Sequence, residues 1–226
     1  PDPGDAARTR GPDPPSGRPA DDVLELLTGA GLALSAGLNA YIPLLVLGVL
    51  ARYTPLVVLS DSWAWLISPW SLGVLGLLLV VEIVADKLPS VDHLNDLAQT
   101  VVRPAAGGIA FATSAASQTH GAAAEAVPLD LPGPLLIVLG VLLALAAHVV
   151  KAVARPAVNL STAGAGAPVA SVVEDVASST LAVLAILVPV FVVVFVLALA
   201  AVAVTAVRQR RRHRRRLILP AKRTPT

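Results

Sequence analysis

Cysteine is absent from this 226-residue chain, which excludes disulfides, thiolate metal sites and cysteine nucleophiles. Charge is also scarce: 14% of the residues are charged, whereas a soluble domain carries about 25%. Hydrophobic residues make up 55% of the chain, and the mean hydropathy is +0.75. Together with several long apolar runs, this composition indicates a membrane protein. The sequence has no phosphate-binding loop, zinc-protease motif or serine-nucleophile motif, so we do not expect an enzyme.

The basic residues are concentrated at one end of the chain. Residues 208–226 hold nine Lys and Arg and no acid, leaving eight basic against 15 acidic residues elsewhere, a balance of −7. Because this tail directly follows an apolar run, we expect it to bind anionic lipid, at about 1 kcal/mol per basic residue, and not nucleic acid. The headgroup ligands that we predict are Arg210, Arg211, Arg212, Arg214, Arg215 and Arg216.

Three parts follow from the composition. Residues 1–20 are rich in Pro, Gly and charge and bury too little apolar surface to order themselves, so we expect a disordered leader. Residues 21–207 read as an all-α, polytopic transmembrane bundle of about six spans with broken or kinked helices, and 208–226 as a basic tail. The expected spans are residues 23–53, 71–85, 91–114, 134–153, 156–176 and 176–207, with re-entry as the alternative for 156–176.

Orientation follows from the distribution of Lys and Arg. A cytoplasmic tail and six crossings would place both termini in the cytoplasm of a bacterial inner membrane. Trp63, Trp65 and Trp70 would then mark the outer boundary. Residues 35–43 and 161–171 are both interrupted by Gly and Pro, which leaves open a three-plus-three inverted repeat. The sequence leaves homo-oligomerisation open as well.

Ionisable residues gather in residues 80–108, where the hypothesis of a functional site is strongest because charge is costly beside hydrocarbon. Glu82 and Asp86 are four apart and share a helix face, and Asp92 and Asp96 repeat this spacing with His93 beside them. A helix hairpin around Pro89 would bring the two faces together. Such groups suit a divalent cation or a proton relay; no other cofactor is expected.

Two alternatives stay open for these charges. They can be ordinary interfacial residues, with Arg103 pairing structurally with Glu82 or Asp96. A second acidic pair, Glu174 and Asp175, lies outside by this topology and so apart from the first cluster unless residues 157–176 re-enter.

Two further polar residues lie in the predicted spans. Asn39 adds a polar group where Pro43 interrupts the first span, because proline removes the hydrogen bond to the carbonyl four residues back. His148, near the cytoplasmic end of the fourth span, could approach Asp96. A broken helix with a polar group is typical of transporter binding sites, whereas a lone histidine is more often packed than bound to a ligand.

Two blocks carry a family resemblance, namely AGLNAYIPLLVLGVLAR and VEIVADKLPSVDHLNDLAQTVVRPAAGG. Over residues 23–205 the chain resembles the bacterial membrane family known as domain of unknown function four-one-two-six. This resemblance implies a small polytopic inner-membrane protein and no particular activity. Glu82, Asp86 and Lys87 also resemble the Glu-x-Gly-Asp-Lys signature of cation/proton exchangers, with one extra residue and alanine in place of glycine.

We therefore carry two hypotheses. In the first, the chain is a small secondary transporter or permease in which the acids bind a cation, a proton or another small charged substrate, with Arg103 as counter-ion. In the second, it is a non-transporting scaffold or lipid-interacting protein whose charges hold the bundle together. Acidic sites that share one polar cavity would favour the first; acids each paired with an internal arginine would favour the second.

Overall fold

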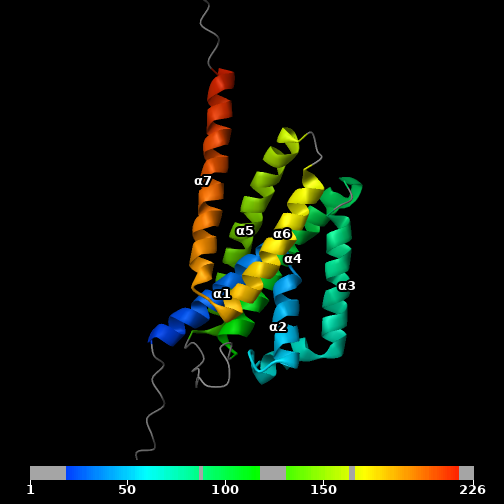
Figure 1. Ribbon diagram of the computed structural model, residues 1–226, viewed down its shortest axis with the longest axis vertical. Coiled ribbons are helices and arrows are strands. Elements are labelled where there is room, and N and C mark those ends of the chain that lie inside the picture. Colours follow the sequence, from blue (N-terminus) through cyan, green and yellow to red (C-terminus); the bar gives the residue numbers. More distant parts are fainter. Residues whose placement is uncertain (1–18, 87–88, 118–130, 163–165, 219–226) are drawn as a thin grey trace, which may run out of the picture.

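The apolar runs fold as helices. The computed structural model describes residues 19–86, 89–117, 131–162 and 166–218. Within these ranges the elements are α1 (Pro19–Leu38), α2 (Ile42–Tyr53), the 3-10 helix η1 (Asp61–Ile67), α3 (Pro69–Ala85), α4 (Pro89–Ala115), α5 (Gly133–Ser161), α6 (Ala167–Leu187) and α7 (Phe191–Ile218) (Figure 1). The prediction of a helical protein is confirmed for this part of the chain.

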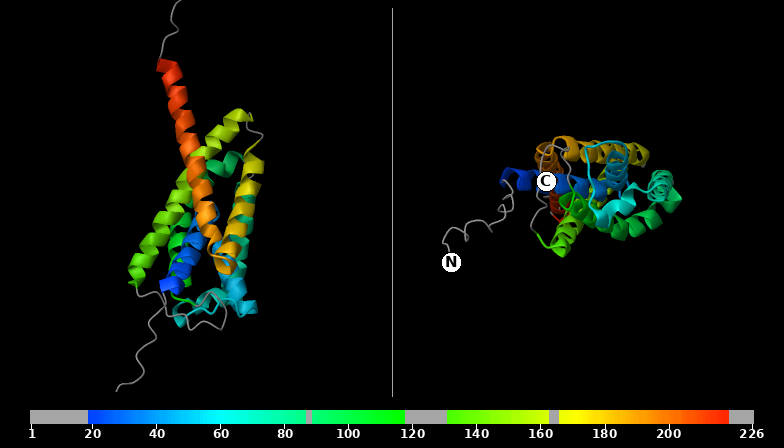
Figure 2. Two further views of the ribbon diagram at one scale, coloured as in Figure 1. Left: turned by 60° about the vertical axis from the view of Figure 1, so that its left-hand side comes forward. Right: turned by 90° about the horizontal axis from the view of Figure 1, so that it is seen from below.

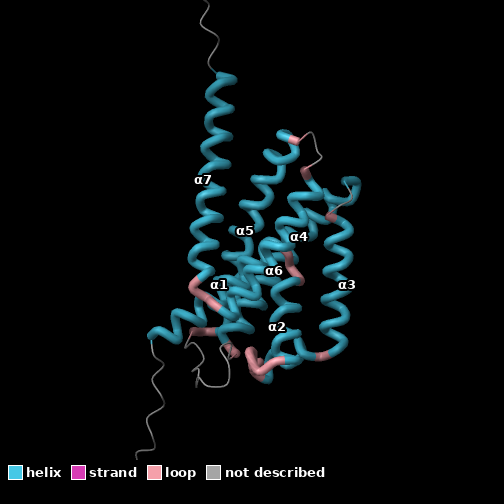
Figure 3. The backbone as a smooth tube through the Cα atoms, in the orientation of Figure 1, coloured by secondary structure: helices cyan, strands magenta, loops and turns pink. Residues whose placement is uncertain are grey.

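Helices α1 and α2 form a hairpin, and this corrects the prediction of a single span over residues 23–53. The predicted break at Asn39 and Pro43 is present, since α1 ends at Leu38 and α2 begins at Ile42 (Figure 3). Leu26 of α1 and Trp63 of η1 pack against the same apolar cluster, so the chain returns to the end from which α1 started. Proline removes a helical hydrogen bond but does not set the direction of the next helix.

Helices α1, α4 and α5 pack closely because glycine lies at their contacts. A Cβ atom on Gly140 of α5 would collide with the Gly107 carbonyl of α4, and one on Gly37 of α1 would collide with the Ala144 carbonyl of α5. Small residues at such contacts let helix backbones approach and gain dispersion energy where no water is available to drive association. These three helices form the centre of the bundle, and α6 packs on α1 beside them (Figures 1 and 2).

Helices α6 and α7 form a second hairpin, within the charge-free run predicted as the last span. The helix stops at Leu187, and Pro189 lies in the turn before α7 begins at Phe191. A groove between the two helices is lined by Ala177 and Leu184 on one side and by Ala198 and Phe191 on the other, so the helices run antiparallel. The 32 residues predicted as one last span, 176–207, are therefore divided between two helices.

Two further helices end later in the structure than the sequence predicted. The fourth span was predicted to end near Val153, but α5 continues through Pro156 to Ser161. Helix α7 also continues past the predicted boundary at residue 207, as far as Ile218.

Within the part of the chain that the structure describes, two helical segments are long and apolar enough to cross a membrane by length and composition, Gly133–Arg155 and Pro168–Leu187. The number rises to three if η1 and α3, which are bent by 60° at their junction, count as one broken span. Six spans and an inverted repeat are therefore not confirmed. Helix α1 starts at one end of the bundle and α7 finishes at the other (Figure 1). The placement of both termini in the cytoplasm stays a prediction.

Candidate functional site

A buried polar cluster surrounds the point where α1 ends. Helices α3, α4, α5 and α6 each contribute charged side chains to it, and the α1–α2 break contributes backbone and amide groups. Several of these side chains are almost fully enclosed; Glu82 is 2% exposed and Arg103 is 0% exposed. The charged members of this polar cluster are Glu82, Asp86, Arg103, Lys151, Arg155, Glu174 and Asp175.

Lys151 of α5 lies among three oxygen atoms. Its Nζ is 2.7 Å from Glu174 Oε2 and 3.7 Å from Asp86 Oδ2, and it donates a hydrogen bond of 3.3 Å to the Leu38 carbonyl. Because Leu38 is the last residue of α1, its carbonyl has no partner within that helix. A cation at this position also complements the negative end of the helix dipole. The ammonium group thus links α1, α5, α6 and the end of α3.

Arg155, one helical turn beyond Lys151, contacts the same two carboxylates. Its Nη2 is 3.3 Å from Asp86 Oδ2 and 3.5 Å from Glu174 Oε2. The Ser171 hydroxyl of α6 donates a further hydrogen bond of 3.1 Å to Asp86 Oδ2. Burial alone would raise the pKa of the Asp86 carboxyl, but the nearby cations, Lys151 first, lower the pKa below its ordinary value. Asp86 is therefore ionised at neutral pH.

Arg103 of α4 contacts two ionisable side chains. Its Nη2 donates to Glu82 Oε1 at 2.9 Å, and its Nη1 lies 3.3 Å from His148 Nδ1. A guanidinium can only donate, so His148 Nδ1 accepts and the imidazole is neutral with its proton on Nε2. That nitrogen lies 3.4 Å from the Thr100 hydroxyl.

Three buried atoms near Arg103 have no hydrogen-bond partner among the described residues. They are Glu82 Oε2, Arg103 Nε and Gln99 Oε1. An arginine and a carboxylate commonly pair through two parallel hydrogen bonds, and here they make one. Buried polar atoms are otherwise almost always paired, so each exception requires an explanation.

Asn39 organises the helix break. Its Oδ1 accepts hydrogen bonds from the backbone N–H groups of Tyr41, at 3.1 Å, and Ile42, at 3.3 Å, near the start of α2. Its Nδ2 donates to Asp175 Oδ1 at 2.9 Å. The side chain therefore satisfies otherwise orphaned amides while tying the break to α6.

The structure brings together the two acidic sites that the predicted topology kept apart. Glu174 shares Lys151 and Arg155 with Asp86, and Asp175 binds Asn39. The separation was wrong because α5 continues to Ser161 and α6 begins only at Ala167, so Glu174 and Asp175 lie in the first half of α6, beside the C-terminal part of α5. Of the two pairings proposed for Arg103, the one with Glu82 is present.

Several of the predicted site residues lie where their side chains are not described. Helix α4 includes Asp92, His93 and Asp96, and helix α7 includes Arg210, Arg211, Arg212, Arg214, Arg215 and Arg216. Their proposed roles in ion and headgroup binding stay predictions.

Sequence reasoning missed the central role of Lys151 and Arg155. The prediction included them only in the overall distribution of Lys and Arg that sets the orientation. Their spacing of four residues, with His148 one turn earlier, places three polar groups on one face of an otherwise apolar helix. This spacing could have identified Lys151 and Arg155 as members of a polar helix face from the sequence alone.

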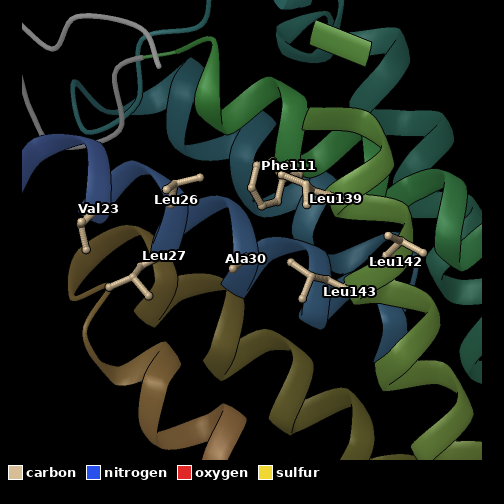
Figure 4. A pocket seen from close by; sticks show the side chains of 8 residues that line it. All are labelled: Val23, Leu26, Leu27, Ala30, Phe111, Leu139, Leu142 and Leu143. Atoms are coloured by element: carbon tan, nitrogen blue, oxygen red, sulfur yellow. The ribbon is translucent and has the colours of Figure 1, made fainter. Parts of the chain in front are cut away.

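The cavities found near the bundle surface are mainly apolar. One, in Figure 4, is lined by Val23 and Leu27 of α1, Phe111 of α4 and leucines of α5. A shallow cavity of about 620 Å³ between the ends of α5 and α6 includes Glu174 among its lining residues. Within the described ranges no three His, Cys, Asp or Glu side chains are grouped to hold a metal ion.

Comparison with curated proteins and with solved structures gives no match. The helical content and the segments able to cross a membrane agree with the resemblance noted in the sequence. A family model described as "Domain of unknown function (DUF4126)" matches residues 26–209, and the chain therefore belongs to this family.

Proposed function

We propose that this protein is a small secondary transporter that moves a proton or another small cation through the polar cluster. The observation that carries the proposal is the convergence of Asp86, Glu174 and the Leu38 carbonyl on one ammonium group at a helix break. Discontinuous helices whose free carbonyls and neighbouring acids face a common point are the usual ion sites of transporters.

Charge balance supports a positively charged substrate. The described members of the cluster include four acids, which are Glu82, Asp86, Glu174 and Asp175, and three fixed cations. With His148 neutral, a cluster with all four acids ionised carries one negative charge. Because net charge is costly in a low-dielectric interior, one proton or one monovalent cation would neutralise the cluster.

Lys151 defines how such a substrate would bind. Its ammonium group already occupies the position among the three oxygen atoms, so a metal cation must displace it. Displacement would need the Lys151 side chain to swing away or to lose its proton. The proposal is therefore an exchange, in which the protein's own cation and the substrate compete for Asp86 and Glu174.

One observation favours the second candidate, a non-transporting membrane scaffold. Glu82, Asp86 and Glu174 each have an internal cationic partner, and of the cavities named above only the shallow one reaches a member of the cluster, Glu174. A buried ion pair is a weak source of stability, however, because desolvation offsets much of the attraction. Seven buried or half-buried charges are therefore an expensive way to hold a bundle together.

Reconstitution into liposomes tests the proposal. We expect cation or proton flux that falls at least tenfold in Asp86→Asn and Glu174→Gln. The matched control is Asp61→Asn, an exposed acid at the start of η1, which should leave flux unchanged. Absence of flux for protons and for monovalent and divalent cations would favour the scaffold, as would equal flux in all variants.

A further inference from the structure

We infer that Glu82 carries an exchangeable proton and is the protonation site of the bundle. This inference rests on the proposed function in naming the proton as the species bound, but its test does not require transport. The carboxyl group belongs to α3 and pairs with Arg103 of α4.

Hydrogen bonding at Glu82 fits a neutral carboxyl better than a carboxylate. An ionised carboxylate offers about four acceptor sites, yet among the described residues this one accepts a single hydrogen bond, from Arg103 Nη2. Its second oxygen is buried and has no partner among the described residues. A proton on that oxygen turns an unsatisfied acceptor into a donor and removes the cost of an under-solvated negative charge.

An acceptor for this proton is present on the next helix. Gln99 precedes Arg103 by one turn of α4, so the two side chains share a face. Its Oε1 is also buried and without a partner, and the same side chain reaches the Tyr41 hydroxyl. Around Arg103 the two orphaned acceptors, Glu82 Oε2 and Gln99 Oε1, outnumber the one orphaned donor, Arg103 Nε, and one added proton would restore the balance.

The other titratable groups facing Glu82 are poor places for the proton. Arg103 forces His148 to accept at Nδ1, which keeps that imidazole neutral. Asp86, further along the chain from α3, is held ionised by Lys151 and Arg155. Tyr41, at the start of α2, is already protonated at neutral pH. A protonated Glu82 leaves three ionised acids against three fixed cations, so the described cluster becomes neutral.

Infrared pH-difference spectra of the reconstituted protein test the inference directly. A protonated carboxyl group has a carbonyl stretch that a carboxylate lacks. We expect this band at neutral pH in the native protein and its loss in Glu82→Gln. The control Asp86→Asn should keep the band, since Asp86 is ionised; Asp175→Asn, at a half-buried acid, is the substitute if Asp86→Asn does not fold.

Thermal unfolding gives a second readout. Glutamine has the shape and neutrality of a protonated glutamate, so Glu82→Gln should retain the melting temperature of the native protein. Asp86→Asn removes one partner of a buried ion pair and should melt earlier. A band that persists in Glu82→Gln, no band in the native protein, or a melting temperature that falls as far in Glu82→Gln as in Asp86→Asn would each overturn the inference. If the native protein shows the band but no flux, and Glu82→Gln loses the band, the proposed function is rejected and this inference stands.

Discussion

Replacing Lys151 by methionine should destabilise the bundle by about 3 kcal/mol. Methionine is similar in length but carries no charge, so the change removes the cation while keeping most of the apolar contacts. The Lys151 side chain is 3% exposed, and its loss removes one of the two cations that contact Glu174 and Asp86, the other being Arg155.

The magnitude follows from the burial of each partner. Removing one partner of a buried ion pair costs about 3–5 kcal/mol, because the remaining charge is left uncompensated. Two features place Lys151 at the lower end of this range. Arg155 continues to contact both carboxylates, and the Glu174 side chain is 17% exposed and so retains some hydration.

The assay is reversible unfolding in detergent, followed by circular dichroism, for Lys151→Met, Glu174→Gln and the double variant. If the two side chains interact as described, the double variant should lose less than the sum of the two single losses. The exposed Arg52 of α2 provides the control, and its replacement should cost less than about 1 kcal/mol. A loss of that small size for Lys151→Met, or strict additivity in the double variant, would refute the described ion-pair geometry.

Two further predictions concern packing and pH. Gly140→Ala should destabilise the bundle by about 1–3 kcal/mol, because its methyl group meets the backbone of Gly107, whereas Gly73→Ala in α3 has open space and should be neutral or stabilising in thermal unfolding. Equal effects at the two positions would contradict the close approach of α4 and α5. The cationic neighbours of Asp86 lower its folded-state pKa below the unfolded value. The ionised carboxylate therefore stabilises the fold above the unfolded pKa, and this stabilisation is lost as pH falls through the folded pKa. The unfolding free energy measured from neutral to acidic pH should therefore decline less steeply in Asp86→Asn than in the native protein, and identical slopes would argue against the ion pairs of Asp86.

Local features of the chain were readable from the sequence because they depend on neighbouring residues. Pro43 interrupts a helix wherever the surrounding chain lies, so the break near Asn39 was predicted at the right position. The spacing of Glu82 and Asp86 likewise placed both acids on one face of a helix, and in the structure this face meets Arg103 of α4 and Lys151 of α5.

The partners of these acids depended on the tertiary structure. Proline ends a helix but leaves the direction of the following helix to packing, and both hairpins arise from packing. Only when α6 runs back past the end of α1 does Glu174 reach Lys151, and only the close approach of α4 and α5 at Gly107 and Gly140 brings His148 to Arg103. The sequence alone thus determined a helical, membrane-type chain with costly charges, whereas long-range packing decided which charge neutralises which.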